Sequence, residues 1–509
     1  MTSTASDAGG GRLVRVSRIL PSERYQSLAA YVAAGGGKGL DAARAVSAET
    51  VIEELAASGL RGRGGAGFPT GIKWRTIKAY ASSSRRTSIV VNAAEGEPGT
   101  FKDRAIIRAN PYAVLEGALI AAQAMDADTI VVATKARFGP EISRLVDALA
   151  EVVAAGWTGD VRVRIVQGPA EYLYGEETAL LEVIDGRPPF PRIAPPFRRG
   201  IDEIVLTDAD IDAGSGLAAP VQMAGTQQQS EAPPVLVNNI ETMANVPGII
   251  ANGATWFRSL GTNDSPGTLV CTISGAVRRP GVAEVAMGTT LHEVIDDVGG
   301  GVHPGRHVRG VLVGVSSAVI TPEQLDTALT YEAMTAIGSG LGSGGYIVFD
   351  DETDPTSVTA GVSRFLAIES CGQCTACKHD GADIARLLGG IAAGTGRRDD
   401  LATIDERLQT VADGARCSLG RQHQTVVGSL VEVFREQITA RLDDDANPLD
   451  VVLIAELDEI DDTGAHLDAS FVNKQPDWTY GSPDSGKTPV ERFTDHRAEG
   501  TSSEAASPT

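Results

Sequence analysis

The stretch SIVVNAAE, residues 88–95, indicates the fold class, because a β-branched run of this length is typical of a buried strand. After it, the pattern predicts a helix over residues 111–125 and a strand over TIVVATKA, residues 129–136. A helix over 141–154 and a strand over VRVRIVQG, residues 161–168, follow. Strands that alternate with helices predict a parallel α/β sheet.

The N-terminal part is predicted to be polar and helical. A short helix is expected over residues 25–33, and a second helix begins after Ser47, a good N-cap, and ends at Gly59. On the other side of the α/β region, residues 207–234 have the composition of a loop.

The C-terminal half changes character twice. Residues 267–350, with a turn at RRPG, predict a small mixed β domain, and residues 362–442 predict helices. Residues 443–509 are rich in Asp, Ser, Pro and Gly, so we expect a mostly disordered tail with a short structured element at VVLIAEL, residues 451–457.

The charge of the chain excludes some functions. The 509 residues carry a net charge of -22, to which the 16 acidic and 4 basic residues after Leu442 contribute -12. Nucleic-acid binding needs a basic face and is not expected; the acidity favours simple solubility. The sequence contains no run of about 18 apolar residues, so no membrane span is expected. The N-terminus does not resemble a secretory signal. We expect a protein of the reducing cytoplasm.

Four of the five cysteines are spaced like ligands. Cys371, Cys374 and Cys377 form CGQCTAC, and Cys417 lies 40 positions further on. Four thiolates favour a [4Fe–4S] cluster. Structural zinc, which prefers two separated cysteine pairs, and four ordinary buried thiols are the alternatives. Cys271 lies in a predicted strand and is expected to be a core residue.

A glycine-rich loop, RGRGGAGFPTG, offers backbone N–H groups that side chains do not obstruct. Such a loop can cradle a phosphate, and Lys73 is close enough in sequence to add a positive charge. The loop does not fit the G-x-G-x-x-G dinucleotide pattern, so a purely structural turn is the alternative.

Two acidic segments favour a ligand site. NAAEGEPGTFKDR, residues 92–104, follows the carboxyl end of a predicted strand, where ligands of open α/β sheets bind. EYLYGEETALLE, residues 171–182, enters a helix, and Glu176 and Glu177 lie at its start. The helix dipole alone also accounts for carboxylates at that position.

Five motifs together resemble one known family. They are GLRGRGGAGFPTGIKW (59–74), NAAEGEPGTFKDR, YLYGEETALLE (172–182), VNNIETMANVP (237–247) and ESCGQCTACKHDG (369–381). In this order they resemble the flavin- and NADH-binding (51 kDa-type) subunit of respiratory complex I and of related NAD-linked hydrogenases and formate dehydrogenases. Cys417 in RCSLG matches the family's distant fourth ligand. The resemblance runs from about residue 25 to residue 442.

The resemblance implies a domain order. An N-terminal segment (1–58) would precede a Rossmann-like FMN/NADH domain (59–260), a ubiquitin-like β-grasp domain of the SLBB type (261–352) and a helical [4Fe–4S] domain (353–442). The acidic tail (443–509) extends past the usual end of the family.

The resemblance also implies the site residues. FMN would be held by Gly62, Gly64, Lys73, Asn92, Glu95, Tyr172, Gly175, Glu176, Asn238, Asn239 and Thr242. Phe68, Glu97, Glu177 and Phe197 would face the nicotinamide nucleotide, and the four cysteines would hold the cluster. NADH would reduce FMN, and electrons would then pass through the cluster; no residue need act as a general base.

The same resemblance implies partners and leaves one alternative. A thioredoxin-like [2Fe–2S] subunit and a larger multi-cluster iron–sulfur subunit would accept the electrons, in a complex that lies in the cytoplasm or at the cytoplasmic face of the membrane. Three positions depart from the usual family pattern: Thr76 in place of an aromatic residue, Ala94 in place of an acidic one and Ala194 in place of a lysine. They leave open a second hypothesis, an FMN and [4Fe–4S] electron-transfer and assembly module that does not oxidise NADH.

Overall fold

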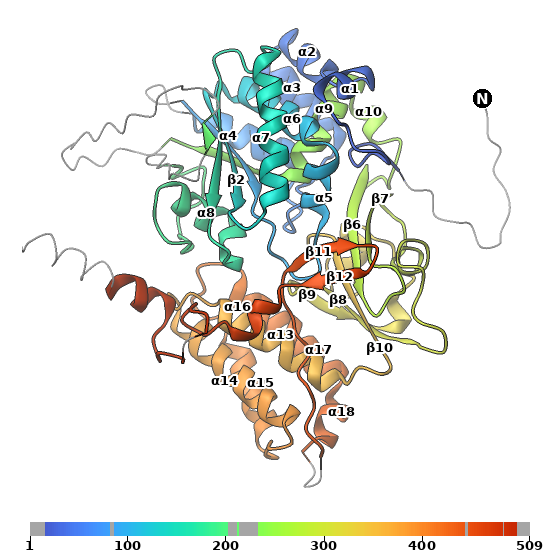
Figure 1. Ribbon diagram of the computed structural model, residues 1–509, viewed down its shortest axis with the longest axis vertical. Coiled ribbons are helices and arrows are strands. Elements are labelled where there is room, and N and C mark those ends of the chain that lie inside the picture. Colours follow the sequence, from blue (N-terminus) through green and yellow to red (C-terminus); the bar gives the residue numbers. More distant parts are fainter. Residues whose placement is uncertain are drawn as a thin grey trace, which may run out of the picture.

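The computed structural model describes residues 16–81, 86–201, 211–212, 233–442, 446–481 and 483–495. An α/β region, a small β domain and a helical region lie around a common centre, as Figure 1 shows. The predicted loop over residues 207–234 lies largely outside the described residues. Within them, no helix is both long enough and apolar enough to cross a bilayer.

The predicted parallel sheet is confirmed. Its strand order is β4 (Ile211–Asp212), β3 (Arg162–Gly168), β2 (Thr129–Lys135), β1 (Ser88–Ala93) and β5 (Val235–Asn239). Strands β3, β2, β1 and β5 run parallel, and β4 pairs with β3 in the antiparallel sense. The carboxyl ends of β1 and β5 therefore lie side by side, which positions the residues that follow each strand at one edge.

Helices cover both faces of this sheet. On one face α3 (Ala48–Ser58), α6 (Pro111–Met125), α7 (Gly139–Ala154) and α9 (Ile240–Asn252) bury Ile89, Val91, Ile130 and Val132 in one core. On the other face α8 (Glu177–Ile184) packs on the alternate residues Val90 and Val131. Both faces of a parallel sheet must be covered, which is why these strands appear in the sequence as continuous apolar runs.

The N-terminal helices belong to the same core. Ser47 caps α3 as predicted, and Gly59 ends it with φ +73°. The helix expected over residues 25–33 is shorter, α1 (Leu28–Ala33), because Ser27 caps it by accepting from the amide of Ala30. A further helix, α2 (Lys38–Arg44), was not predicted. Leu28 and Leu40 are buried in the core of the α/β region.

The small β domain has the strand order β7 (Gly281–Ala286), β6 (Thr268–Gly275), β10 (Gly345–Asp350), β8 (Val308–Val313) and β9 (Ser317–Ile320). The β6–β10 pair at its centre is parallel, and the neighbouring pairs are antiparallel. Helix α11 (Leu291–Glu293) continues into η2 (Val294–Val298), which packs on the sheet. This arrangement is the expected β-grasp fold.

The helical region confirms the predicted bundle. It contains α13 (Pro355–Glu369), α14 (Thr375–Ala392), α15 (Asp400–Thr410), α16 (Leu419–Gln422), η4 (His423–Val427), α17 (Gly428–Val433) and α18 (Arg435–Ala440). Its apolar side chains form a separate core that includes Cys371 and Cys377.

The prediction of a mostly disordered tail is wrong for residues 446–481 and 483–495. They form β11 (Leu457–Asp461), β12 (Gly464–Leu467) and η5 (Ala469–Asn473), and bury Phe471 and Trp478 in the core of the helical region. Most of the VVLIAEL segment has no regular structure, although Ile454 is buried. The acidic composition of this segment wrongly predicted disorder, because basic residues elsewhere in the fold pair with its acidic side chains.

Candidate functional site

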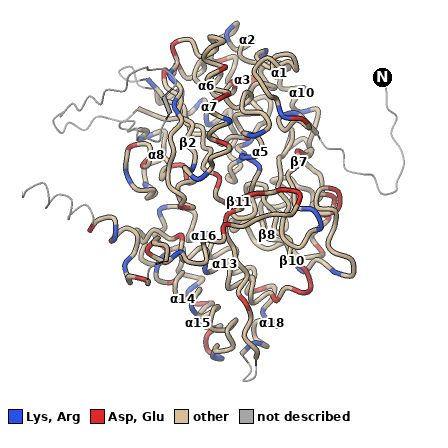
Figure 2. The backbone as a smooth tube through the Cα atoms, viewed as in Figure 1, with Lys and Arg blue, Asp and Glu red and all other residues tan. Residues whose placement is uncertain are grey.

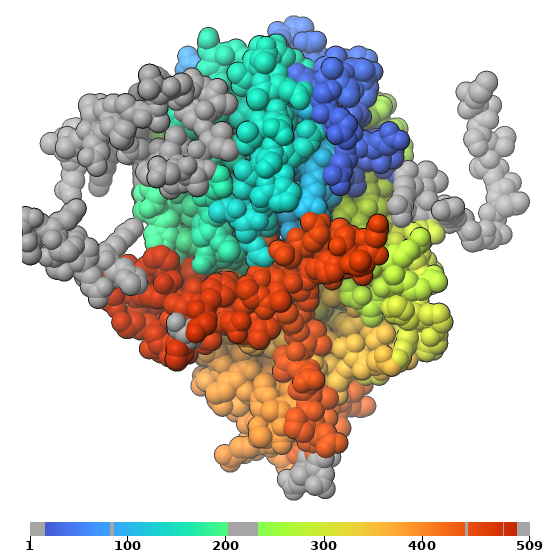
Figure 3. Space-filling model, in the orientation of Figure 1, coloured from blue at the N-terminus to red at the C-terminus, as the bar shows by residue number. Residues whose placement is uncertain are grey.

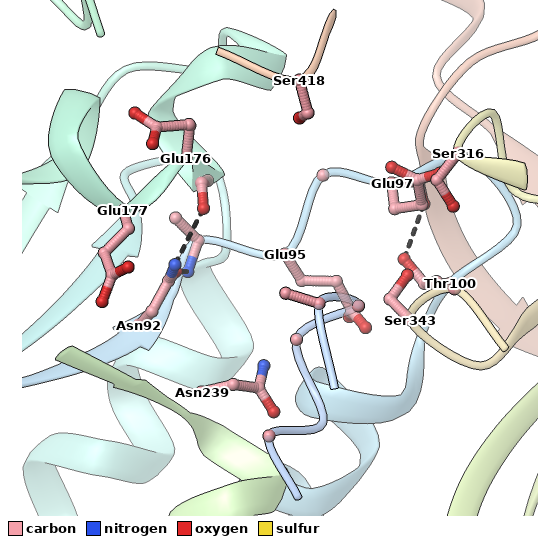
Figure 4. Close-up of a pocket in the computed structure, with 18 of the residues that line it drawn as sticks. Asn92, Glu95, Glu97, Thr100, Glu176, Glu177, Asn239, Ser316, Ser343 and Ser418 are labelled. Atoms are coloured by element: carbon pink, nitrogen blue, oxygen red, sulfur yellow. Dashed lines mark hydrogen bonds between the residues drawn. The ribbon is translucent and has the colours of Figure 1, made fainter. Parts of the chain in front are cut away.

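A cavity of about 550 Å³ opens where the three regions meet. The glycine loop, the ends of β1 and β5 and the segment before α8 line one part of it. The β-grasp domain adds Ser316 and Ser343, and the helical region adds Ser418. Figure 4 shows Glu176 and Glu177 on one side of the cavity, the two β-grasp serines on the opposite side, and Glu95 between them. Its size is that of a typical cofactor pocket.

Hydrogen bonds from backbone amides fix the conformation of the glycine loop. The amide of Gly62 donates to the carbonyl of Phe68 (2.8 Å), and the amide of Arg63 donates to Oγ1 of Thr242 (2.9 Å). Gly67 has φ +62°, and a Cβ at this position would lie 2.4 Å from the ring of Tyr331. Glycine is therefore required for the loop to approach the cavity with bare backbone.

The structure brings together all eleven residues that the family resemblance assigned to FMN. These lining residues are Gly62, Gly64, Lys73, Asn92, Glu95, Tyr172, Gly175, Glu176, Asn238, Asn239 and Thr242. Bare backbone, a lysine and several amide and hydroxyl groups are a donor set that suits a phosphorylated flavin. The residues present therefore fit FMN.

Three of the four residues expected to face the nicotinamide nucleotide also line the cavity: Phe68, Glu97 and Glu177. Phe197 does not. Its ring lies 5.3 Å from the ring of Tyr80, centroid to centroid, and packs against the core of the α/β region. Phe197 therefore lies outside the lining of this cavity, and its contact with the nucleotide stays a prediction.

Two carboxylates lie on the β1 side, the buried Glu95 and the half-buried Glu97. Glu95 accepts from the amide of Asp103 (3.1 Å) and from Nε of Arg104 (3.3 Å). Burial, followed by the nearby Asp103, raises the pKa of Glu95. Burial also raises the pKa of Glu97, although this carboxylate accepts from the Tyr172 hydroxyl (2.5 Å) and from the amide of Val315 (2.7 Å).

The α8 side carries the other two acidic residues. Glu176 is the N-cap of α8 and accepts from the amides of Thr178 (3.0 Å) and Ala179 (2.8 Å). It also lines the cavity, so capping is not its only contact. Burial raises its pKa. Glu177 forms a direct ion pair with Lys73, so one anion and one cation of the lining lie next to each other.

The four motif cysteines surround a second, small cavity. Cys371 and Cys377 are buried, and Cys374 and Cys417 are half-buried. The amide of Arg416 donates to Sγ of Cys374 (3.3 Å). Burial raises the pKa of Cys371 to about 11 and that of Cys417 to about 12.

The arrangement of these thiols fits a cluster. All four line one small cavity, which suits a cubane in which each cysteine binds a different iron. Cys271 is a fully buried core residue in β6, as expected.

The two cavities adjoin. Leu173 lines both, and Ser418, which lines the larger cavity, follows Cys417 of the smaller one. Residues that sequence reasoning missed come mainly from the other two regions: Ser316, Ser317, Gly342, Ser343, Arg421, Gln422 and Thr425. No local motif marks them, because only the packing of the regions brings them to the site.

Comparison with known proteins agrees with this geometry. The family model described as "Nuo51 FMN-binding domain" matches residues 55–248, the "NADH-ubiquinone oxidoreductase-F iron-sulfur binding region" matches 357–441, and the "SLBB domain" matches 270–316.

Similar proteins include an F subunit of the NADH-quinone oxidoreductase of Rhizobium meliloti, 35% identical over 82% of this chain and 94% of that protein. The corresponding F subunit of Streptomyces coelicolor is 35% identical over 82% of this chain and 88% of its own. Among solved structures, the NAD+-reducing [NiFe]-hydrogenase in the H2-reduced state superposes with a TM-score of 0.69 and 30% identity, over 83% of this chain and 68% of that one. The chain therefore belongs to the family of NADH-quinone oxidoreductase F subunits.

Proposed function

We propose that this chain is the NADH-oxidising subunit of a multi-subunit oxidoreductase and carries FMN and one [4Fe–4S] cluster. One observation carries the proposal: the glycine-loop cavity adjoins the four-cysteine cavity through Leu173 and the Cys417–Ser418 pair. FMN held by this cavity would supply the chemistry that links a two-electron nicotinamide donor to one-electron iron–sulfur acceptors.

The residues of the chain bind and orient the cofactors. The glycine loop with Lys73 receives the flavin phosphate, and Asn92, Asn238 and Asn239 offer amide groups along the cavity. Glu97 and Glu177, with the exposed ring of Phe68, face the entering nucleotide. Glu95 is buried in the wall of the cavity, where the amide of Asp103 and Nε of Arg104 hold its position.

The partners follow from the chemistry. The described residues contain one group of four cysteines and the separate Cys271, so a further iron–sulfur protein must receive the electrons. A thioredoxin-like [2Fe–2S] subunit and a larger multi-cluster subunit are the proposed partners. We infer that the complex lies in the cytoplasm, with this chain in a peripheral arm where the rest of the complex is membrane-bound.

Rapid mixing tests the function. Anaerobically purified chain, reconstituted with FMN, iron and sulfide, is mixed with NADH, and flavin absorbance is followed. Bleaching of the flavin followed by cluster reduction supports the proposal; NADPH serves as the donor control. An unbleached flavin at millimolar NADH contradicts it.

A second candidate function rests on specific observations. Phe197 lies outside the cavity, and Thr76, Ala94 and Ala194 lack the side chains usual in the family. These features favour a module that relays electrons between protein partners without oxidising NADH. That function predicts an unbleached flavin with NADH but rapid bleaching with dithionite, in the same apparatus.

A further inference from the structure

The C-terminal strap, defined as the described residues 446–481 and 483–495, lies beyond the family match, which ends at residue 441. In Figure 3 this segment, coloured red, crosses the face of the molecule between the α/β region and the helical region. Its acidic residues, visible along β11 in Figure 2, pair with the α/β region: Glu459 binds Arg108 (2.5 Å) and Asp458 binds Arg137 (2.8 Å). These surface pairs attach the strap, but two buried pairs connect it to the site.

The first buried pair joins Glu456 of the strap to Lys135 at the end of β2. Oε2 of Glu456 lies 2.6 Å from Nζ of Lys135, and both side chains are buried. The same Nζ donates to the carbonyl of Ala170 (3.0 Å). Lys135 therefore connects the strap to the segment that leads into Tyr172.

The second buried pair joins Lys474 of the strap to Glu369 at the end of α13. Nζ of Lys474 lies 2.6 Å from Oε1 of Glu369, and both side chains are buried. The other oxygen of Glu369 accepts from the backbone amide of Tyr172 (3.2 Å). Glu369 therefore connects the strap to Tyr172 directly.

Both connections reach the same short segment, 170–172. From it the Tyr172 side chain extends to the cavity, where its hydroxyl donates to Glu97 and accepts from Nε2 of Gln422 (3.0 Å). Tyr172 thus lies between a wall carboxylate of the cavity and the helix that follows Cys417.

Buried charges hold their neighbours in place only while they are paired. A buried carboxylate such as Glu369, deprived of its ammonium partner, moves toward water, and its hydrogen bond to the Tyr172 amide weakens as it moves. The strap supplies one member of each pair, one acidic and one basic. Neither member lines the cavity, so removing either one acts on the wall only by displacing residues 170–172.

We propose that Glu456 and Lys474 are positioning residues that hold Tyr172 in its place at the flavin cavity. They act through Lys135 and Glu369, and neither lines the cavity. The proposal rests on the cavity being the flavin site. The strap would then influence the affinity and the midpoint potential of the flavin, in addition to stabilising the fold.

The test compares three variants of the full chain. Lys474→Met removes the ammonium with similar volume, and Lys487→Met is the matched control, because Lys487 lies on the exposed part of the strap and pairs with Asp495. The double variant Lys474→Met/Glu369→Gln removes both buried charges but keeps an amide oxygen that accepts from Tyr172. FMN affinity and the flavin midpoint potential are measured with the melting temperature.

The expected result separates position from stability. Lys474→Met weakens FMN binding by roughly tenfold, because Tyr172, a residue of the cavity lining, is displaced. The double variant regains most of the affinity while its melting temperature stays below that of the native chain. Lys487→Met changes neither.

One outcome overturns the proposal: Lys474→Met lowers the melting temperature but leaves FMN affinity and midpoint potential at native values. If Lys474→Met does not fold, Glu456→Leu takes its place, because Glu456 acts on the same segment through Lys135. FMN affinity and midpoint potential are measured in the same way. Failure of the proposed function is a different result, because the flavin of the native chain would then stay unbleached with NADH, whereas FMN affinity and midpoint potential are measured without NADH.

Discussion

Cys417 differs from the other three cluster thiols because it lies in the segment that also reaches the larger cavity. Replacing it by alanine is expected to abolish stable cluster assembly, since one iron would lack its protein ligand. FMN binding is expected to survive, because most of the lining comes from the α/β region. Iron content and flavin content per chain measure the two effects.

Cys271→Ala is the matched control, because Cys271 is buried in β6, in the core of the β-grasp domain. It is expected to keep full iron content. Equal iron in the Cys417→Ala variant and the native chain would contradict the assignment.

His423 is a buried residue whose charge state affects stability. Its Nε2 lies 2.9 Å from Oγ of Ser363, and burial lowers its pKa to about 3. The unfolded chain, with an ordinary histidine pKa, binds this proton as pH falls below about 6.5, whereas the folded chain stays neutral. The contribution of neutral His423 to the free energy of unfolding is therefore fully present above about pH 6.5 and is lost progressively as pH falls toward 3.

His423→Gln is expected to flatten this loss. Urea unfolding between about pH 5 and pH 7 should show a free energy of unfolding that changes less with pH in the variant, by at most about 1.4 kcal/mol per pH unit. His466→Gln, on the exposed β12, is the control and should keep the native slope. An equal change of the free energy of unfolding with pH in the native chain and in His423→Gln would contradict this prediction.

The glycine loop is the element on which cofactor binding depends most. Gly67→Ala forces a Cβ to within 2.4 Å of the Tyr331 ring at a positive φ, so the loop or the ring must move. The Tyr331 hydroxyl also donates to the carbonyl of Gly62 (3.1 Å). A displaced Tyr331 ring would therefore also displace the glycine loop at Gly62. FMN affinity is expected to fall by roughly tenfold or more, since such strain costs on the order of 1–3 kcal/mol.

Gly139→Ala is a suitable comparison, because a Cβ at that position, at the start of α7, meets nothing within 4 Å. It is expected to leave FMN affinity unchanged. Fluorescence titration of apo protein with FMN measures both variants, and equal dissociation constants would show that the loop tolerates a side chain.

Across the whole molecule, the cavity joins three regions, so FMN should stabilise all three together. At a hundredfold excess over the dissociation constant, a ligand that binds only the folded state adds about 2.7 kcal/mol. Hydrogen exchange is expected to slow on FMN addition both in the glycine loop and in α16, which contributes Arg421 and Gln422 to the lining. Protection confined to the α/β region would argue against a shared site.

Local sequence patterns were sufficient to predict the strands β1, β2 and β3 and the helices α3, α6 and α7, because apolar periodicity and caps are properties of short segments. The motif residues from Gly62 to Cys417, which the family resemblance assigned to the cofactors, line the two cavities, and their roles in binding stay a prediction. Glycine loops and cysteine triplets can be recognised before folding, since their chemistry depends on spacing along the chain.

The remaining features depend on tertiary packing. Helix α2 is too short to be stable alone and exists because it packs in the core. The ring of Phe197 packs against Tyr80 and does not line the cavity, whereas Gln422, from the helical region, does line it. The strap is ordered because Glu456 and Lys474 find buried partners more than 100 residues away in sequence, which no local pattern reveals.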